Sequence, residues 1–270
     1  MNQEKNAYVL GTDKEEMFRL GLQHQVWSGE ARKGWKIAEF GPGQTILDLG
    51  CGPGFCSTEL GYIVGKEGKV IAVDKSKVYT DYLKHQAELQ GLNIDVINSD
   101  FSTLKLNTQL DGAYCRWALC WIDNPGEVIQ EIADSMVSGG VFVAHEYFDW
   151  STLQTEPFKE NLATAIKTIL ELFRSPPGNI DIGRHLPALF YSAGLEVIST
   201  RPMSKIGVPD DLTWEWPNSF FRNFFKKLVA DGLLDKEVYH KAIDELDELE
   251  YTEGACIFTP QMIEVVAVKP

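Results

Sequence analysis

The sequence is poor in basic residues and in long apolar runs. Its 270 residues hold 25 Lys and Arg against 39 Asp and Glu, which gives a net charge of −14. Because binding to a phosphate backbone requires a basic surface, nucleic acid is not expected as a partner. No apolar run approaches the ~20 residues that a membrane span needs. The opening MNQEKNAYVLGTDKEE lacks the layout of a signal peptide. The sequence therefore predicts a cytoplasmic protein with no membrane partner.

Cysteine is also scarce, and its spacing excludes the common cysteine-based sites. The five cysteines are odd in number and form no CxxC pair or Cys/His cluster; they are Cys51, Cys56, Cys115, Cys120 and Cys256. We expect reduced, packed thiols and no metal site. Apolar residues, in contrast, make up 44% of the chain, with 14 Phe, 9 Tyr and 7 Trp. That is enough for one large α/β domain, or one domain plus a cap.

Between about residues 44 and 146, apolar runs typical of strands alternate with helical stretches. This pattern indicates a parallel sheet with crossover helices. Ser76 is positioned to cap one of these helices, and Asn124-Pro125 to begin another. The expected strands are QTILDLG (44–50), KVIAVD (69–74), IDVINSD (94–100), GAYCRWA (112–118) and GVFVAHE (140–146).

The segments on either side of this region are predominantly helical. Residues 13–39 predict one or two amphipathic helices, and residues 156–174 and 183–192 predict further ones. A strand is expected at 194–200 and a last one at 263–268. Between them, residues 202–261 hold an aromatic stretch at 214–221 and the acidic run IDELDELEY, which is typical of a solvated helix face.

The most specific motif is ILDLGCGPGFCSTEL, residues 46–60, which predicts a buried strand, a glycine-dense turn and a helix. Gly50, Gly52 and Gly54 allow a tight turn and a close approach of the backbone to a ligand. The dinucleotide fingerprint GxGxxG is not complete, because position 55 is Phe. An NAD-dependent oxidoreductase is therefore disfavoured. A tight corner without any ligand is the structural alternative.

Carboxylates stand at or near the ends of the first three expected strands. Asp74 closes the second strand, where an acid can accept both ribose hydroxyls of a nucleoside. Asp48, Asp74 and Asp100 have only Lys75 and Arg116 nearby in the sequence. This charge balance suits the sulfonium of S-adenosylmethionine better than a pyrophosphate.

These residues resemble the motif series of the class I S-adenosylmethionine-dependent methyltransferases. The resemblance rests on ILDLGCGPG, Asp74, the Asp100-Phe101 pair and DGAYCRWAL. The segments YVLGTDKEEMFRLGLQHQVW, GGVFVAHEYFDW and IGRHLPALFYSAGLEV look like bacterial small-molecule members. The resemblance implies a doubly wound, mostly parallel seven-stranded sheet, the Rossmann-like methyltransferase fold, with an antiparallel last strand.

The resemblance also implies a division of the chain and a set of site residues. Residues 1–40 would form an N-terminal helical lid. Residues 41–201 and 262–270 would form the cofactor-binding α/β domain, and 202–261 a helical cap insertion that meets the acceptor. The residues implied for S-adenosylmethionine are Tyr8, Gln23, Gly50, Cys51, Gly52, Gly54, Asp74, Lys75, Asp100, Phe101 and Arg116.

Two further sets follow from residues near the expected strand ends. His145 and Glu146 are candidates for catalytic proton transfer, with packing and orientation of a loop as the alternatives. An aromatic set would wall a substrate pocket, or else fill the core. It comprises Trp117, Trp121, Tyr147, Phe148, Trp214 and Trp216.

The sequence thus predicts methyl transfer from S-adenosylmethionine to a small-molecule acceptor by a monomer or homodimer. The choice between O-, N- and C-methylation stays open. One alternative is a cofactor-binding regulator or partner protein without transferase activity. An aminopropyltransferase-like relative is another, although residues 111–121 lack the strongly acidic motif that a polyamine would require.

Overall fold

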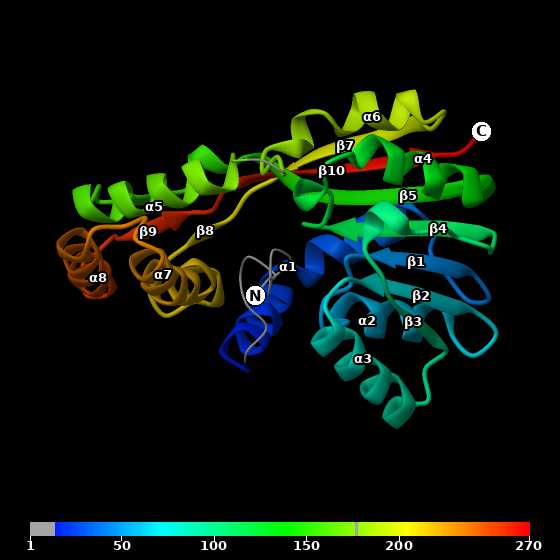
Figure 1. Ribbon diagram of the computed structural model, residues 1–270, viewed down its shortest axis with the longest axis horizontal. Coiled ribbons are helices and arrows are strands. Elements are labelled where there is room, and N and C mark those ends of the chain that lie inside the picture. The colour runs from blue at the N-terminus through cyan, green and yellow to red at the C-terminus, as the bar shows by residue number, and fades with distance from the viewer. Residues whose placement is uncertain (1–13, 176–177) are drawn as a thin grey trace, which may run out of the picture.

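A computed structural model describes residues 14–175 and 178–270, except for the side chains of Lys14 and Ser102. Its main feature is a seven-stranded sheet with the order β3-β2-β1-β4-β5-β10-β7 (Figure 1). Only β10 runs antiparallel to its neighbours. The strands are β1 Thr45–Leu49, β2 Lys69–Asp74, β3 Ile94–Asn98, β4 Leu110–Arg116, β5 Met136–Asp149, β7 Glu196–Met203 and β10 Gln261–Val268. The predicted α/β fold with its antiparallel strand is confirmed.

Helices cover both faces of this sheet, and the alternation of side chains along each strand explains which face each helix meets. Ile46 of β1 packs with α1 and α2, whereas Leu47 packs on the opposite face with α4 and α6. The predicted cap is present, since Ser76 accepts a hydrogen bond from the backbone of Tyr79. These helices are α1 Lys14–Ile37, α2 Phe55–Val64, α3 Lys77–Gln90, α4 Pro125–Ser135 and α6 Leu186–Ser192.

A second layer lies beyond the ends of β5, β7 and β10 (Figure 1). It contains a small sheet with the order β6-β9-β8 and three helices. Its elements are β6 Gln154–Glu156, α5 Glu160–Phe173, β8 Ile206–Gly207, α7 Leu212–Ala230, α8 Lys236–Glu250 and β9 Cys256–Phe258. In the described part of the chain there are also four short 3-10 helices: η1 Phe101–Thr103, η2 Leu119–Trp121, η3 Trp150–Thr152 and η4 Ile182–Arg184.

This layer differs from the predicted cap because α5 and β6 belong to it. Both come from inside the segment 41–201, which the sequence assigned to the cofactor-binding domain. Helix α5 packs on α8, where Glu245 accepts hydrogen bonds from the backbone of Asn161 and of Leu162, the latter at 2.7 Å. The acidic run is therefore not a purely solvated face, because this carboxylate satisfies free N–H groups at the start of α5.

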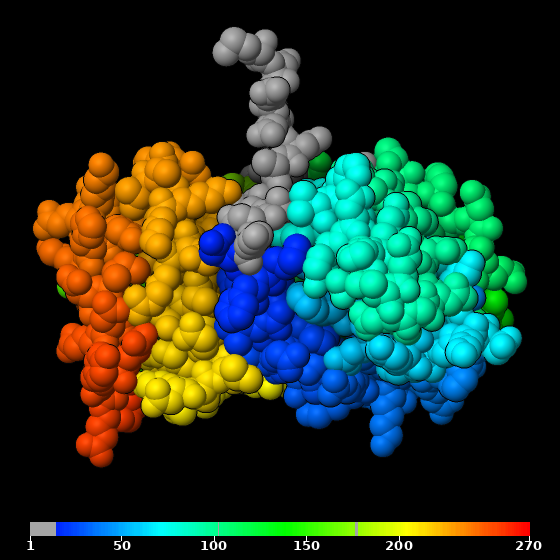
Figure 2. All heavy atoms as spheres, turned by 90° about the horizontal axis from the view of Figure 1, so that it is seen from below, coloured from blue at the N-terminus to red at the C-terminus, as the bar shows by residue number. Residues whose placement is uncertain are grey.

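Helix α1 is one continuous helix that joins the two layers. Ala31 and Trp35 pack on the seven-stranded sheet, while Val26 and Trp27 pack with Trp216 of α7. In Figure 2 the blue α1 lies between the yellow and orange segments of α7 and α8 and the cyan α2 and α3. Among the described residues, none of the helices has the length and apolar character to cross a membrane.

Candidate functional site

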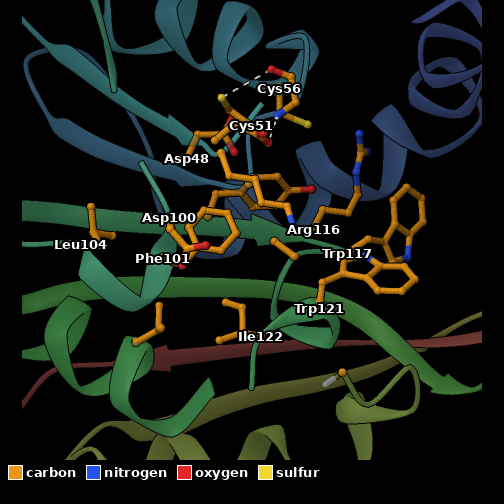
Figure 3. A pocket seen from close by; sticks show the side chains of 18 of the residues that line it. Asp48, Cys51, Cys56, Asp100, Phe101, Leu104, Arg116, Trp117, Trp121 and Ile122 are labelled. Carbon is orange, nitrogen blue, oxygen red and sulfur yellow. Dashed lines mark hydrogen bonds between the residues drawn. The ribbon is translucent and has the colours of Figure 1, made fainter. Parts of the chain in front are cut away.

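A cavity of about 620 Å³ opens where β1, β2 and β4 end (Figure 3). Figure 3 shows Asp100 and Phe101 on one side of it and Trp117 and Trp121 on the other. The described residues that line it include six carboxylates against three basic side chains. Most of the residues predicted for the cofactor are among its walls: Gln23, Gly50, Cys51, Gly52, Asp74, Lys75, Asp100, Phe101 and Arg116.

The glycine turn shapes one wall of this cavity. Gly50 and Gly52 have φ values of 72° and 53°, in the left-handed region that favours glycine. A Cβ on Gly50 would lie 2.3 Å from the Cβ of Ala118, so this backbone approach requires glycine. A Cβ on Gly52 would meet no atom within 4 Å. Gly52 therefore leaves its face of the cavity open.

Gly54 does not line the cavity, which corrects its predicted contact with the cofactor. Its φ is 86°, and a Cβ there would lie 2.2 Å from Cδ1 of Leu83. The third glycine is needed because α2 and α3 pack closely at that point.

Asp74 is fixed beside the turn by two backbone hydrogen bonds. Its Oδ2 accepts from the N–H of Gly52 at 2.9 Å, and its Oδ1 accepts from that of Ser76 at 2.8 Å. Burial raises the pKa of this carboxyl group. Each carboxylate oxygen has a second acceptor direction, so the oriented group can also accept hydrogen bonds from a ligand.

Arg116 and Asp48 place opposite charges at the base of the cavity. Nη2 of Arg116 lies 3.3 Å from Nδ1 of His24, while Nη1 has no hydrogen-bond partner in the described structure. Asp48 accepts from the hydroxyl of Ser57 at 2.5 Å, and burial raises its pKa to about 6. Asp48 was not predicted as a site residue, although its charge was noted from the sequence; its position inside the first motif was the available signal.

A second cavity of about 60 Å³ adjoins the first and is walled by aromatic rings. The ring of Trp117 stacks between those of Tyr147 and Trp216, with centroids 5.6 and 5.9 Å away. Three of the six predicted pocket residues thus form one stack, and Trp121 lines both cavities. Trp117 has a φ of 55°, which is strained for a bulky residue. We call this smaller cavity the aromatic pocket.

Two predicted pocket residues are not in the aromatic pocket. Phe148 is 38% exposed and packs its ring against the guanidinium of Arg184. Trp214 is 2% exposed and belongs to the hydrophobic core. Trp150, Pro217 and Phe220 also line the aromatic pocket. The remaining walls were not predicted because they come from separate segments: Arg19, Leu20, Leu153, Phe173 and Pro260.

The predicted catalytic pair, His145 and Glu146, lines neither cavity. Nε2 of His145 lies 2.8 Å from Oε2 of Glu264, and its Nδ1 lies 3.3 Å from the hydroxyl of Tyr114. Burial lowers the pKa of this imidazole. The side chain is sequestered on the α1 face of the sheet, so this placement contradicts a direct catalytic role for His145.

Glu146 orients a loop instead. Its Oε1 accepts from the backbone N–H groups of Ala118 and Leu119 at 2.9 and 2.8 Å. The carboxyl group is fully buried, and burial raises its pKa to about 7. It positions the loop that carries Ala118 against Gly50. The remaining predicted residue, Tyr8, lies outside the described residues.

Comparisons with known proteins agree with this arrangement. Residues 46–140 match a family model described as a methyltransferase domain. An uncharacterised 37.1 kDa protein of transposon TN4556 from Streptomyces fradiae is 28% identical to this chain. The match covers 61% of this chain and 47% of that protein. A demethylmenaquinone methyltransferase from Desulfitobacterium hafniense (strain Y51) is also 28% identical, and the match covers 52% of this chain and 59% of that protein. The chain therefore spans about half the length of these curated relatives.

A solved structure has a similar fold over most of its length. The geranyl diphosphate C-methyltransferase from Streptomyces coelicolor A3(2) has a TM-score of 0.57, and the match covers 99% of this chain and 90% of that one. Its sequence is 14% identical, so this likeness shows the fold alone.

Proposed function

We propose that this chain, whose residues 46–140 form a methyltransferase domain of the class I S-adenosylmethionine-dependent type, transfers a methyl group from that cofactor to a small-molecule acceptor. The observation that carries the proposal is the Asp74 carboxylate, held against the open Gly50–Gly52 turn in the wall of the larger cavity. An acid at the end of the second strand is the usual acceptor for ribose hydroxyls in such folds.

The residues present fit S-adenosylmethionine chemically. Asp74 would accept from the ribose hydroxyls, and Arg116, with its unpartnered Nη1, would pair with the carboxylate of the methionine part. Phe101 would pack against adenine, and Asp100 would accept from the exocyclic amine. The excess of carboxylates in the walls suits a sulfonium cation and disfavours a polyphosphate.

The cofactor, when bound, supplies a methyl group carried on a sulfonium, and the sulfur that remains after transfer is a neutral thioether. The chain contributes orientation and exclusion of water. Gly50 brings the backbone close, Glu146 fixes the loop at Ala118, and the aromatic pocket adjoins the cofactor cavity. An acceptor in the aromatic pocket would thus lie next to the reacting centre and away from bulk water.

Calorimetry tests the proposal directly. S-adenosylmethionine and S-adenosylhomocysteine should bind the purified protein at micromolar levels, and NAD should not. Tight NAD binding, or no binding of either adenosyl compound, would refute it. Product formation from radiolabelled methyl donor in a screen of small metabolites then separates an enzyme from a regulator that binds the cofactor without transfer.

Three further predictions from the sequence belong to this proposal: a cytoplasmic location, a monomeric or homodimeric state and the lack of a nucleic-acid partner. Size-exclusion chromatography with light scattering tests the oligomeric state.

A further inference from the structure

The two cavities share a wall, and this wall identifies where an acceptor would meet the cofactor. The shared residues are Leu20, Gln23, Trp117, Trp121 and Phe173. At about 60 Å³, the aromatic pocket has room for roughly four to six water molecules. It therefore suits a compact group that extends into the larger cavity.

The walls of the aromatic pocket favour a flat guest. Trp117 presents a ring in the stack with Tyr147 and Trp216. Trp121, another wall of the aromatic pocket, packs edge-on to Phe173 at a centroid distance of 5.2 Å. Such rigid rings select planar apolar molecules by stacking and shape.

Gln23 adds a polar group with a fixed orientation. Its Oε1 accepts from Nη1 of Arg19 and from Nε1 of Trp216, both at 2.9 Å. Two donors on the carbonyl oxygen leave the amide nitrogen on the opposite side, and the described structure shows no acceptor for it. This N–H₂ group is a donor in the wall that the two cavities share.

The other polar groups of the aromatic pocket are also mainly donors. Arg19 brings a guanidinium, which is bidentate to Glu16 and lies 5.5 Å from the Phe220 ring centroid. The indole nitrogen of Trp121 can donate a hydrogen bond as well. Burial raises the pKa of Tyr147, so its hydroxyl stays protonated. This set recognises hydrogen-bond acceptors, and it offers an ammonium no carboxylate among the described walls. The charge of Arg19 is paired with that of Glu16.

We propose that the acceptor is a planar aromatic compound whose nucleophile is an acidic hydroxyl, held as an oxyanion by the amide of Gln23 beside the guanidinium of Arg19. This inference rests on the proposed methyl transfer and names its substrate class, a phenolate or the enolate of a conjugated ring. An amine acceptor is disfavoured because the polar groups of the described walls are mainly donors, where an ammonium would need acceptors.

The reaction balances without a base in the pocket. The hydroxyl proton passes to solvent before or during binding, and the oxyanion forms the new oxygen–carbon bond to the methyl group. The carbon–sulfur bond breaks, and its electron pair stays on sulfur, which becomes a neutral thioether. The donors of the aromatic pocket stabilise the oxyanion before transfer.

Three probes with the same nitroaromatic ring test the proposal: para-nitrophenol, para-nitroaniline and para-nitrobenzylamine. Each is titrated by calorimetry into the full chain, with and without S-adenosylhomocysteine. We expect the phenol to bind at least tenfold more tightly than either amine. The visible phenolate band should show a larger ionised fraction for the bound phenol than for the free phenol in the same buffer.

Matched variants assign the effect to the proposed donor. Gln23→Leu, titrated without S-adenosylhomocysteine because Gln23 also lines the larger cavity, should remove most of the preference for the phenol over the two amines. Gln25→Leu, at an exposed position of the same helix, should behave like the wild type. Equal or tighter binding of an amine, a protonated bound phenol or no phenol binding would overturn the substrate class. If the wild type binds the phenol but not S-adenosylhomocysteine, that result would instead count against the proposed function.

Discussion

The larger cavity and the aromatic pocket adjoin each other but are built in different ways. The larger cavity is organised by backbone: the Gly50–Gly52 turn and the ends of neighbouring parallel strands place Asp74 and Arg116. The aromatic pocket is assembled from side chains of α1, β5, α5 and α7 and of the loops after β4 and β5. The first depends on local geometry that one short motif encodes. The second depends on how distant segments pack, so its chemistry can change without altering the first.

Removing the Glu146 carboxyl group, which fixes the loop between the two cavities, should have the largest effect on stability and binding. Glu146→Ala leaves the N–H groups of Ala118 and Leu119 buried without their acceptor. We expect a loss of about 2–4 kcal/mol in the free energy of unfolding, measured with urea. Binding of S-adenosylhomocysteine and of para-nitrophenol should weaken together. Glu146→Gln, which keeps an acceptor oxygen, should retain most of both; a loss confined to one ligand would show that the loop does not couple the regions.

The same buried carboxyl group should make stability depend on pH. Its pKa is raised from 4.5 to about 7 in the folded state, so the folded protein holds this proton more tightly than the unfolded chain. Its stabilising contribution is therefore present at acidic pH and is lost as the pH rises from about 5 to 8. Between these pH values the wild type should lose about 2–3 kcal/mol relative to Glu146→Gln. Parallel urea titrations at both pH values measure this difference, and identical pH profiles would disprove it.

Asp74→Ala should separate the two regions by affecting the cofactor cavity alone. Loss of the oriented acceptor should weaken binding of S-adenosylhomocysteine by roughly 1–3 kcal/mol. Binding of para-nitrophenol to the cofactor-free protein should stay within about twofold of the wild type. Unchanged affinity for S-adenosylhomocysteine in calorimetry would remove Asp74 from the proposed site.

Trp216→Phe should produce the smallest effect, and only in the aromatic pocket. It keeps a ring next to Trp117 but removes the indole donor that orients Gln23. Affinity for para-nitrophenol should fall by roughly 0.5–1.5 kcal/mol, as for one hydrogen bond, with cofactor binding preserved. Trp35→Phe is the matched control, since the Trp35 indole nitrogen is buried without a partner in the described structure and lies in neither cavity. Equal effects of both variants would mean that the donor has no specific function.

The sequence predicted the fold well because its signals are local. Apolar runs and glycine turns located the five strands from β1 to β5 and the helices between them. Strands β7 and β10 were expected near their observed positions as well. The assignment of α5 failed, because its amphipathic pattern shows that one face is buried but not which partner buries it. Its contact with Glu245 of α8 joins residues more than eighty positions apart.

The residues of the candidate site also fall into those with a local sequence signal and those without one. Asp74, Phe101 and Arg116 were predicted because each follows or ends a parallel strand, and such ends meet at one edge of the sheet. His145 was misplaced because adjacent residues of a strand point to opposite faces, and its face lies under α1. Arg19 and Phe173 carried no local signal, since nothing in their neighbouring residues indicates that they share a pocket.

The sequence by itself determined the parallel sheet, the glycine turn and the acid beside it, because hydrophobic period and glycine conformation act over a few neighbouring residues. Tertiary structure alone decided which rings stack into the aromatic pocket and that Oε1 of Gln23 accepts from both Arg19 and Trp216. It also decided that Glu146 orients a loop. These outcomes depend on contacts between segments far apart in the chain, whose geometry is fixed only when the whole core packs.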